Sequence, residues 1–377
     1  MSATHERALE ALAKRGRLRA LQKRSGQDFA SNDYLGLAGS EDLADAVRAA
    51  LDRGVPVGAG GSRLLRGNHE EHEALEAEAA AYFGAESALF FGGGFLANTA
   101  LLSTLPQRGD LIVHDELIHA SAHEGMRSSK AETVKARHND PQAFEDAISA
   151  WRATGGSGQP WIAVESLYSM DGDRAPLDQL SEVARRYDAM LLIDEAHATG
   201  VFGPSGRGLG AALEGQSNVV SLHTCGKALG VMGALVLAPK PIKDYLINRS
   251  RAFIYATAPS PLIAATVRAA LEIIKREPQR QHRLHDLMAV AGALAAEKLG
   301  VAASGSQIQP VIVGSDARAV AVAAAVQAKG FDVRAIRPPT VPEGTARLRL
   351  SITLHTDEEA LSGVILAIKD ALAEHPA

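Results

Sequence analysis

Two stretches decide the fold of this chain: MLLIDEAHATG, residues 190–200, and NVVSLHTCGKALG, residues 218–230. Each begins with a short apolar run and continues into a polar turn. Asp194 closes the first run, and Lys227 lies in the turn after the second. Short apolar runs of this kind are typical of strands buried in a parallel α/β sheet, whose ligands bind at the carboxyl ends of the strands. The sequence therefore predicts a ligand site that includes Asp194 and Lys227.

The same rhythm extends from about residue 85 to residue 240. Further apolar runs between helix-like segments lie at residues 88–91, 111–113, 161–164 and 234–237. A stretch rich in Ala, Leu and Ile follows Pro261 and predicts a long helix that reaches about Leu299. Shorter strands and helices alternate after it. We expect an α/β fold in three parts: an N-terminal helical segment at 1–37, a large domain with a mostly parallel sheet at 38–260, and a small α/β domain at 261–377.

Composition narrows the class of protein. The 377 residues carry 39 Lys and Arg against 44 Asp and Glu, a net charge of -5, which argues against a general nucleic-acid binder. The single cysteine, Cys225, suits a reducing compartment. The sequence has no apolar run of about 18 residues. We expect a cytoplasmic protein that binds neither nucleic acid nor membrane.

The chain from Glu6 to Arg24 is basic and helix-prone. Such a run of charges is usually a solvated helix face. Alternatively, one or two of its arginines could bind an anionic substrate.

The chemistry of Lys227 and Asp194 suggests one cofactor. A lysine amine can form a Schiff base with an aldehyde, and a carboxylate can keep a pyridine nitrogen protonated. Pyridoxal 5'-phosphate (PLP) needs both groups from a protein. Taken singly, each residue could instead be a surface lysine or a helix-capping aspartate.

Three glycines, Gly92–Gly93–Gly94, follow a predicted strand and precede a helix-like segment. The free N–H groups of such a helix start could hold a phosphate. The spacing of Gly92, Gly94 and Ala97 also satisfies a loose dinucleotide fingerprint, with Asp110 or Asp115 as the ribose ligand. A glycine turn without a ligand is the third interpretation.

His119 and His123 would share one face of a helix, as metal-binding pairs do. The sequence offers no obvious third ligand, so we expect no metal. His119 could instead stack on an aromatic cofactor or be purely structural.

The DEAH stretch that begins at Asp194 spells a helicase motif. A helicase also needs a phosphate loop, and here Ser221 and Ala228 stand where that loop requires glycine and a hydroxyl.

Taken together, these motifs resemble the α-oxoamine synthases, fold-type-I PLP enzymes that condense an amino acid with an acyl thioester and release carbon dioxide. The resemblance covers nearly the whole chain. It is carried by SNDYLGL (31–37), GAGGSRL (58–64), HAS (119–121), SMDGD (169–173), DEAH (194–197) and GKALG (226–230). It implies a seven-stranded sheet in the large domain and a homodimer that shares its active sites.

The resemblance also implies a role for each site residue. Lys227 would hold the cofactor and act as the general base, Asp194 would face the ring nitrogen, and His119 would stack on the ring. The other implied cofactor contacts are Gly94, Phe95, Ser169, His197, Thr224 and, from the partner subunit, Thr257. The implied substrate contacts are Asn32, Arg337, Thr340, Arg349 for the amino-acid carboxylate, and Arg19, with Arg17 as its alternative.

The stretch AIRPPTVPEGTARLRL, residues 335–350, resembles most the family members that join L-alanine to a pimeloyl thioester in biotin synthesis. Members that use glycine or serine with another acyl chain remain the nearest alternative. A nicotinamide-dependent dehydrogenase built on Gly92 and Gly94 is a remote one. The sequence does not distinguish CoA from a carrier protein as the acyl carrier.

Overall fold

The computed structural model describes residues 3–376 and divides into two compact units. The large unit comprises Leu35–Ser169 and Arg174–Gln281, and the small unit comprises the chain up to Tyr34, Met170–Asp173 and the chain from His282 onward. This division differs from the expected boundaries after residues 37 and 260. The N-terminal segment lies in the small unit, and the residues from 261 to 281 lie in the large unit.

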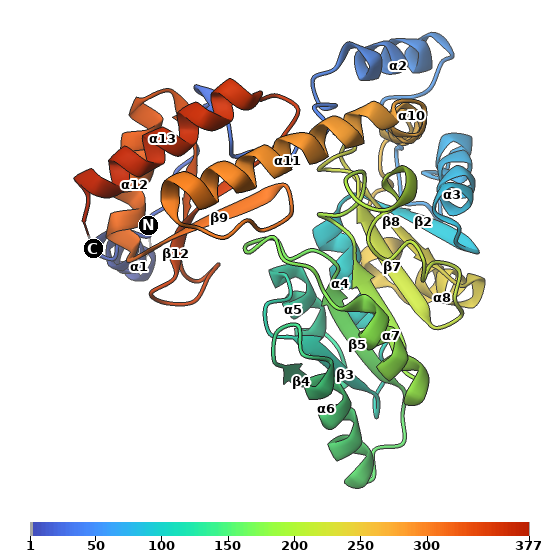
Figure 1. Ribbon diagram of the computed structural model, residues 1–377. Helices are drawn as coiled ribbons and strands as arrows, with labels where there is room; N and C mark the ends of the chain where they lie inside the picture. The colour runs from blue at the N-terminus through green and yellow to red at the C-terminus, as the bar shows by residue number, and fades with distance from the viewer. Residues whose placement is uncertain (1–2, 377) are drawn as a thin grey trace. The chain divides into compact units, whose positions relative to one another are not determined.

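The large unit contains a sheet of seven strands in the order β2-β8-β7-β6-β5-β3-β4 (Figure 1). Their bounds are β2 (Ser87–Phe91), β3 (Leu111–Asp115), β4 (Glu132–Ala136), β5 (Pro160–Glu165), β6 (Met190–Asp194), β7 (Val219–Thr224) and β8 (Ala234–Ala238). Only β8 runs against its neighbours in this sheet. The predicted mostly parallel α/β sheet is confirmed. Strand β4 was not predicted, because its partly polar residues ETVKA lie at the sheet edge and lack an apolar run.

Helices cover both faces of this sheet, and alternate strand residues enter two separate cores. Leu192 packs in the core beneath α4 (Gly94–Thr104), α5 (Ala120–Arg127), α8 (Lys240–Arg249) and α9 (Arg251–Ile254). Its neighbours Leu191 and Ile193 pack on the opposite side, against α6 (Pro141–Ala153) and α7 (Leu177–Arg186). Because Asp194 has the same parity as Leu192, its side chain belongs to the α4 and α5 face.

Three further helices of the large unit are α2 (Glu41–Asp52), α3 (Glu70–Phe83) and α10 (Pro261–Arg276). The expected single helix from Pro261 to Leu299 is wrong, since α10 ends before Glu277 and α11 (Pro278–Leu299) begins after it. Proline has no N–H to donate, and it disfavours helical geometry in the residue before it. Glu277 has φ -119 and ψ 61 accordingly. A short 3-10 turn, η1 (Pro204–Gly206), completes this unit.

The small unit holds an antiparallel sheet in the order β11-β12-β9 and a parallel pair, β1 with β10. The strands are β1 (Gln27–Asp28), β9 (Ile308–Gly314), β10 (Phe331–Asp332), β11 (Arg334–Ile336) and β12 (Ala346–Ser351). The helices are α1 (Ala3–Lys14), α12 (Asp316–Ala328), α13 (Glu358–Glu374) and most of α11, from His282 onward. The expected alternation of short strands and helices is confirmed. The helix expected from Glu6 to Arg24 ends at Lys14, because Gly16 takes the left-handed conformation, with φ +64.

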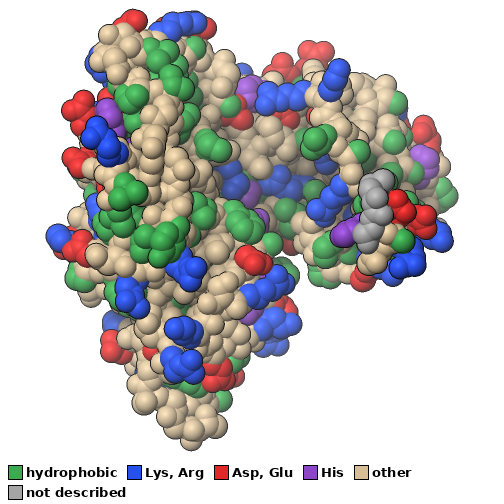
Figure 2. Space-filling model, turned by 180° about the vertical axis from the view of Figure 1, so that it is seen from behind, with side chains coloured by type: hydrophobic (Ala, Val, Ile, Leu, Met, Phe, Trp, Pro, Cys, Tyr) green, Lys and Arg blue, Asp and Glu red, His purple; other side chains and the backbone are tan. Residues whose placement is uncertain are grey.

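The surface agrees with the composition. Lys and Arg side chains are interspersed with Asp and Glu over much of the face seen in Figure 2. Within residues 3–376, no helix is both long and apolar enough to span a membrane.

Candidate active site

The candidate site of the large unit lies at the carboxyl edge of its sheet. Asp194 ends β6, and Lys227 follows three residues after the end of the neighbouring strand β7. Lys227 is half-buried. On the other side of β6, Glu165 ends β5 and pairs in register with Asp194. The parallel strands therefore bring these three polar side chains to one edge, as the sequence predicted for Asp194 and Lys227.

Asp194 is 5% exposed and has two N–H donors. Asn98 Nδ2 donates to its Oδ2 at 2.6 Å, and the backbone N–H of Ala196 donates to its Oδ1 at 2.9 Å. Asn98 lies on α4 and is itself 3% exposed. Two donors in a buried setting suit an anionic carboxylate. This pair of contacts fixes the direction in which Asp194 presents its charge.

The start of α4 lies against the end of β7. Gly93 caps α4 without a side-chain hydrogen bond, so the first N–H groups of the helix stay available for an anion. A Cβ at Gly94 would lie 3.3 Å from Thr224 Oγ1, tighter than an ordinary contact, so a larger residue would crowd this hydroxyl. Phe95, the next residue, is 57% exposed. Gly94, Phe95 and Thr224 thus lie together, and they can supply N–H and O–H donors to one phosphate.

His119 is the N-cap of α5 rather than a residue within it. Its Nδ1 lies 2.8 Å from Ser121 Oγ and accepts the Ser121 backbone N–H at 3.2 Å. Desolvation is the largest cause that lowers the pKa of His119, with Lys227 and His123 acting in the same direction and Asp194 opposing them. His123 packs instead against His114, with ring centroids 5.2 Å apart. In the part of the chain that the structure describes, no three His, Cys, Asp or Glu residues form a metal-binding group.

Glu165 is a residue of this edge that the sequence analysis missed. It is 2% exposed, and within the described residues its Oε1 is buried without a hydrogen-bond partner. Burial and the charge of Asp194 raise its pKa well above the ordinary value, although Lys227 opposes this. The buried Glu165 carboxyl therefore favours its neutral, protonated form.

We expect the Glu165→Gln variant to gain stability relative to the parent protein as the pH rises above about 4.5. The folded protein keeps a proton on Glu165 that the unfolded chain releases in this range, so folding becomes costlier with rising pH. Glutamine keeps the shape and carries no such proton. Urea unfolding at pH 5 and pH 8 measures the difference. Glu272→Gln, at a surface position, is the control, and a stability gap that does not grow with pH would contradict a neutral Glu165.

The remaining predicted residues of the large unit occupy different settings. His197 is 6% exposed and lies in the loop that follows Asp194. Thr257 is exposed, next to Ala258, whose N–H donates to Gly61 O at 2.9 Å. Thr257 is therefore accessible to another chain, as the prediction of a partner contact requires.

The proposed ribose ligands of a dinucleotide site are engaged elsewhere. Asp110 accepts the backbone N–H groups of Gln107 and Gln159 at 2.7 and 2.8 Å. Asp115 is fully buried and accepts from the Asn139 backbone at 2.9 Å. Both carboxylates serve loop structure, and this geometry disfavours the dehydrogenase alternative.

In the small unit, Arg349 on β12 is held by the oxygen atoms of three neighbouring side chains. It is 7% exposed and donates to Asn32 Oδ1 at 3.1 Å, Tyr34 Oη at 3.3 Å and Ser351 Oγ at 2.9 Å. These three partners orient the guanidinium. Arg347, two residues earlier, is paired with Asp171 at 2.5 Å instead. Asn32 and Arg349, both predicted from the sequence, thus lie in direct contact, and Asn32 helps to orient the guanidinium.

The other predicted substrate residues of the small unit line one pocket of about 220 Å³. Arg19 Nη2 lies 3.4 Å from Thr340 Oγ1, and Arg337 donates to Gly16 O. Arg17 also reaches this pocket, but it forms ion pairs of 2.7 Å with Asp316 and with Glu343. Since two carboxylates already engage Arg17, Arg19 is the better candidate for an incoming anion.

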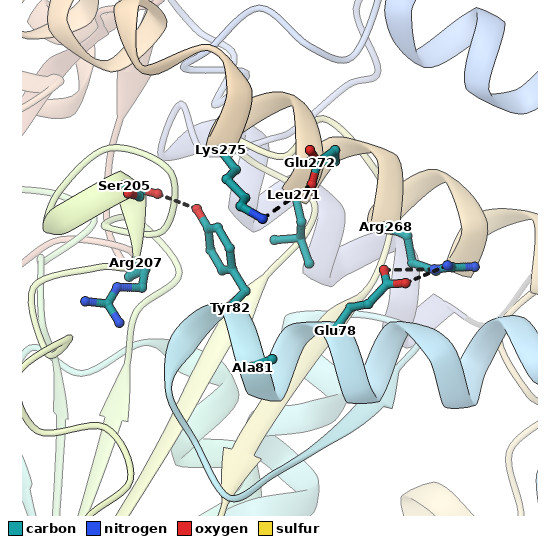
Figure 3. A pocket seen from close by; sticks show the side chains of 9 residues that line it. All are labelled: Glu78, Ala81, Tyr82, Ser205, Arg207, Arg268, Leu271, Glu272 and Lys275. Carbon is teal, nitrogen blue, oxygen red and sulfur yellow. Dashed lines mark hydrogen bonds and ion pairs between the residues drawn. The ribbon is translucent and has the colours of Figure 1, made fainter.

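A further pocket of about 480 Å³ lies between α3 and α10 (Figure 3). Its cations are largely occupied, since Arg268 pairs with Glu78 and Lys275 lies 3.9 Å from Glu272. Tyr82 donates to the backbone oxygen of Ser205 across it. None of the predicted site residues lines this pocket, and it is no candidate for the active site.

Comparisons with known proteins show the family and the fold of the chain. The family described as aminotransferase class I and II matches residues 25–364. The chain is 42% identical to the 8-amino-7-oxononanoate synthase of Anaeromyxobacter dehalogenans, over 93% of this chain and 87% of that protein. It is 41% identical to the enzyme of the same name from Chromobacterium violaceum, over 91% and 88%. A solved serine palmitoyltransferase from S. paucimobilis, with PLP–myriocin bound, is 25% identical to this chain and superposes with a TM-score of 0.89. The match covers 99% of this chain and 97% of that chain.

Proposed function

Because this chain belongs to the aminotransferase class I and II family, and within it to the 8-amino-7-oxononanoate synthases, we propose that it condenses L-alanine with a pimeloyl thioester. The products are 8-amino-7-oxononanoate, carbon dioxide and the free thiol carrier, and the reaction is a step of biotin synthesis. The protein is thus a PLP-dependent acyltransferase of fold type I. The convergence of Lys227, Asp194 and the start of α4 at one sheet edge carries the proposal.

The residues at this edge fit PLP. Thr224 and the uncapped start of α4 fit its phosphate, and the buried Asp194 carboxylate fits a protonated ring nitrogen. PLP, when bound, supplies an electron sink that stabilises a carbanion at the amino-acid Cα. Lys227 supplies the amine that holds the cofactor. Ser169 and His197 are proposed to contact the polar side of the ring, and His119 its face.

The protein's residues then move protons and orient substrates. Lys227 Nζ removes the proton from the Cα of alanine, so that this carbon can attack the thioester carbonyl and expel the thiol. After carbon dioxide is lost, an acid must return a proton to the same carbon, and Lys227 is the proposed donor. Asp194 holds the proton on the ring nitrogen throughout.

We expect Arg349→Gln to raise the KM for L-alanine by about 10- to 100-fold, because a charge-assisted hydrogen-bonded pair contributes about 1.5–3 kcal/mol. Arg349→Lys should recover only part of this loss, since an ammonium group cannot bind a carboxylate in bidentate fashion. Steady-state kinetics with varied alanine measures it. Arg334→Gln, which changes the cross-strand neighbour of Arg349, is the control. An unchanged KM in Arg349→Gln would remove this residue from the substrate site.

We expect Arg19→Gln to raise the KM for pimeloyl-CoA by about tenfold or more, because Arg19 is proposed to pair with the free carboxylate of the acyl chain. Heptanoyl-CoA has the same chain length without that carboxylate, so its KM should change little in this variant. The matched variant Thr340→Val removes the hydroxyl beside Arg19. It should change the ratio of the KM for pimeloyl-CoA to the KM for heptanoyl-CoA less than Arg19→Gln does. Equal losses for both acyl-CoAs would contradict the assignment of Arg19 and of the pocket that it shares with Arg337.

We propose further that the protein is a homodimer in which Thr257 of one subunit reaches the phosphate of the other. Large apolar side chains that a second copy could cover are more than half exposed on the large unit: Val57, Leu65, Phe95, Met232 and Tyr255. Phe95 belongs to the start of α4, and Tyr255 lies near Thr257. Sedimentation at micromolar concentration should give twice the mass of 39.6 kDa. A monomer that retains full activity would refute the shared site.

A further inference from the structure

Two polar side chains, those of Asn98 and Ser121, connect the carboxylate of Asp194 to the ring of His119. Asn98 Nδ2 donates to Asp194 Oδ2 at 2.6 Å and to Ser121 Oγ at 3.0 Å. Ser121 Oγ in turn lies 2.8 Å from His119 Nδ1. Asn98 and Ser121 are 3% and 1% exposed. Neither residue was predicted from the sequence, although a buried asparagine one turn into the apolar helix α4 was an available signal.

The direction of each hydrogen bond follows from the chemistry of the groups. The amide of Asn98 must turn its NH₂ toward Asp194, because its oxygen would be repelled by a carboxylate. The second amide proton then goes to Ser121 Oγ. Since this hydroxyl accepts from Asn98, its own proton is directed to His119 Nδ1.

A second donor makes this assignment robust. The backbone N–H of Ser121 also points at His119 Nδ1, at 3.2 Å. A hydroxyl can rotate to become an acceptor, but a backbone N–H can only donate. A proton on Nδ1 would therefore face two donors. The ring is left neutral, with its single proton on Nε2, in agreement with the lowered pKa of His119, of which desolvation is the largest cause.

We propose that Asn98 and Ser121 are positioning residues that hold His119 as its Nε2–H tautomer, so that its open edge offers a hydrogen-bond donor. The inference rests on the proposed function only for the identity of the acceptor. In the proposed reaction, the thioester carbonyl oxygen gains negative charge as the new carbon–carbon bond forms, and an Nε2–H donor stabilises this charge. An Nδ1–H tautomer would present a lone pair to that oxygen and oppose the reaction.

Histidine NMR tests the tautomer directly, with and without PLP. The protein is labelled with ¹⁵N-histidine, and His119→Gln identifies the His119 signals among the 13 histidines. We expect long-range ¹H–¹⁵N spectra to show His119 with a bare Nδ1 and a protonated Nε2. A protonated Nδ1 at neutral pH overturns the proposal.

Variants test which residues fix it. Ser121→Ala removes one donor to Nδ1 and should raise the pKa of His119 by about one unit, because a hydrogen bond of about 1 kcal/mol to the neutral form is lost. Asn98→Leu should have the same effect through Ser121, and Ser121→Thr should restore the parent value. In Ser103→Ala, the control, the lost hydroxyl contacts only a backbone oxygen of α4.

The activity of the same variants separates positioning from folding. We expect Ser121→Ala to lower kcat about tenfold, with the KM for alanine nearly unchanged. If Ser121→Ala leaves both the tautomer and the pKa of His119 as in Ser103→Ala, the proposal is wrong. The NMR result does not depend on which amino acid or thioester the enzyme uses, so failure of the proposed function would be seen separately, in the substrate screen.

Discussion

Lys227→Ala should abolish turnover, lowering kcat by about 10⁴-fold or more, and the purified variant should lack the violet absorption of a lysine-bound cofactor. The amine of Lys227 both holds the cofactor and moves the Cα proton, so its loss removes two functions at once. Lys227→Arg should fail similarly, because a guanidinium remains protonated and cannot act as the base. Initial rates and the visible spectrum measure both effects.

The control for this experiment is Lys240→Ala. Lys240 begins α8, is exposed and pairs with Asp244 at 2.5 Å. It should keep the spectrum and the rate of the parent protein. If the Lys227→Ala variant condensed its substrates at the parent rate, the assignment of the cofactor site would be wrong.

Asp194→Asn should retain PLP but slow the removal of the Cα proton by about 10³-fold or more. Asparagine keeps the size of the side chain but carries no charge, so it cannot hold the ring nitrogen protonated, and the ring becomes a poorer electron sink. The NH₂ of the new amide would also face one of two donors, the Asn98 amide or the Ala196 N–H, unless Asn98 turns. Exchange of the alanine Cα hydrogen with deuterated water, followed by NMR, measures this step without the thioester.

Asp110→Asn is the matched control for Asp194. Asp110 is likewise buried at the edge of a sheet strand, yet it bonds only backbone N–H groups outside the predicted site. It can lower stability but should leave the exchange rate per folded molecule unchanged. An Asp194→Asn variant that exchanges as fast as Asp110→Asn would place the ring nitrogen elsewhere.

Local sequence patterns predicted the strands that carry the site and most of the helices. The apolar runs before Asp194 and Lys227 predicted strands β6 and β7. A strand that is buried on both faces has a continuous apolar run instead of alternating apolar and polar residues. Gly16 and Pro278 carried the signals that end α1 and separate α10 from α11, but helix propensity outweighed them in our prediction. These errors are of boundary rather than of element type.

The remaining parts of the site depend on tertiary contacts. The choice between Arg17 and Arg19 rests on Asp316 and Glu343, which are some 300 residues away in sequence and pair with Arg17. Glu165 became visible only when the register of β5 placed it beside Asp194. A contact between segments that are distant in the sequence leaves no local sequence pattern, so one sequence alone does not predict it.

The most direct test of the central claim is the visible absorption spectrum of the purified protein after addition of PLP. L-Alanine, glycine and L-serine are then added separately, each with and without pimeloyl-CoA. We predict a violet-absorbing band that L-alanine shifts, and a further transient band that appears only when alanine and pimeloyl-CoA are both present. If no such band forms even with added PLP, the cofactor assignment and the role of Lys227 are wrong. If the band responds to glycine or serine instead of alanine, the PLP chemistry stands but the proposed substrate does not.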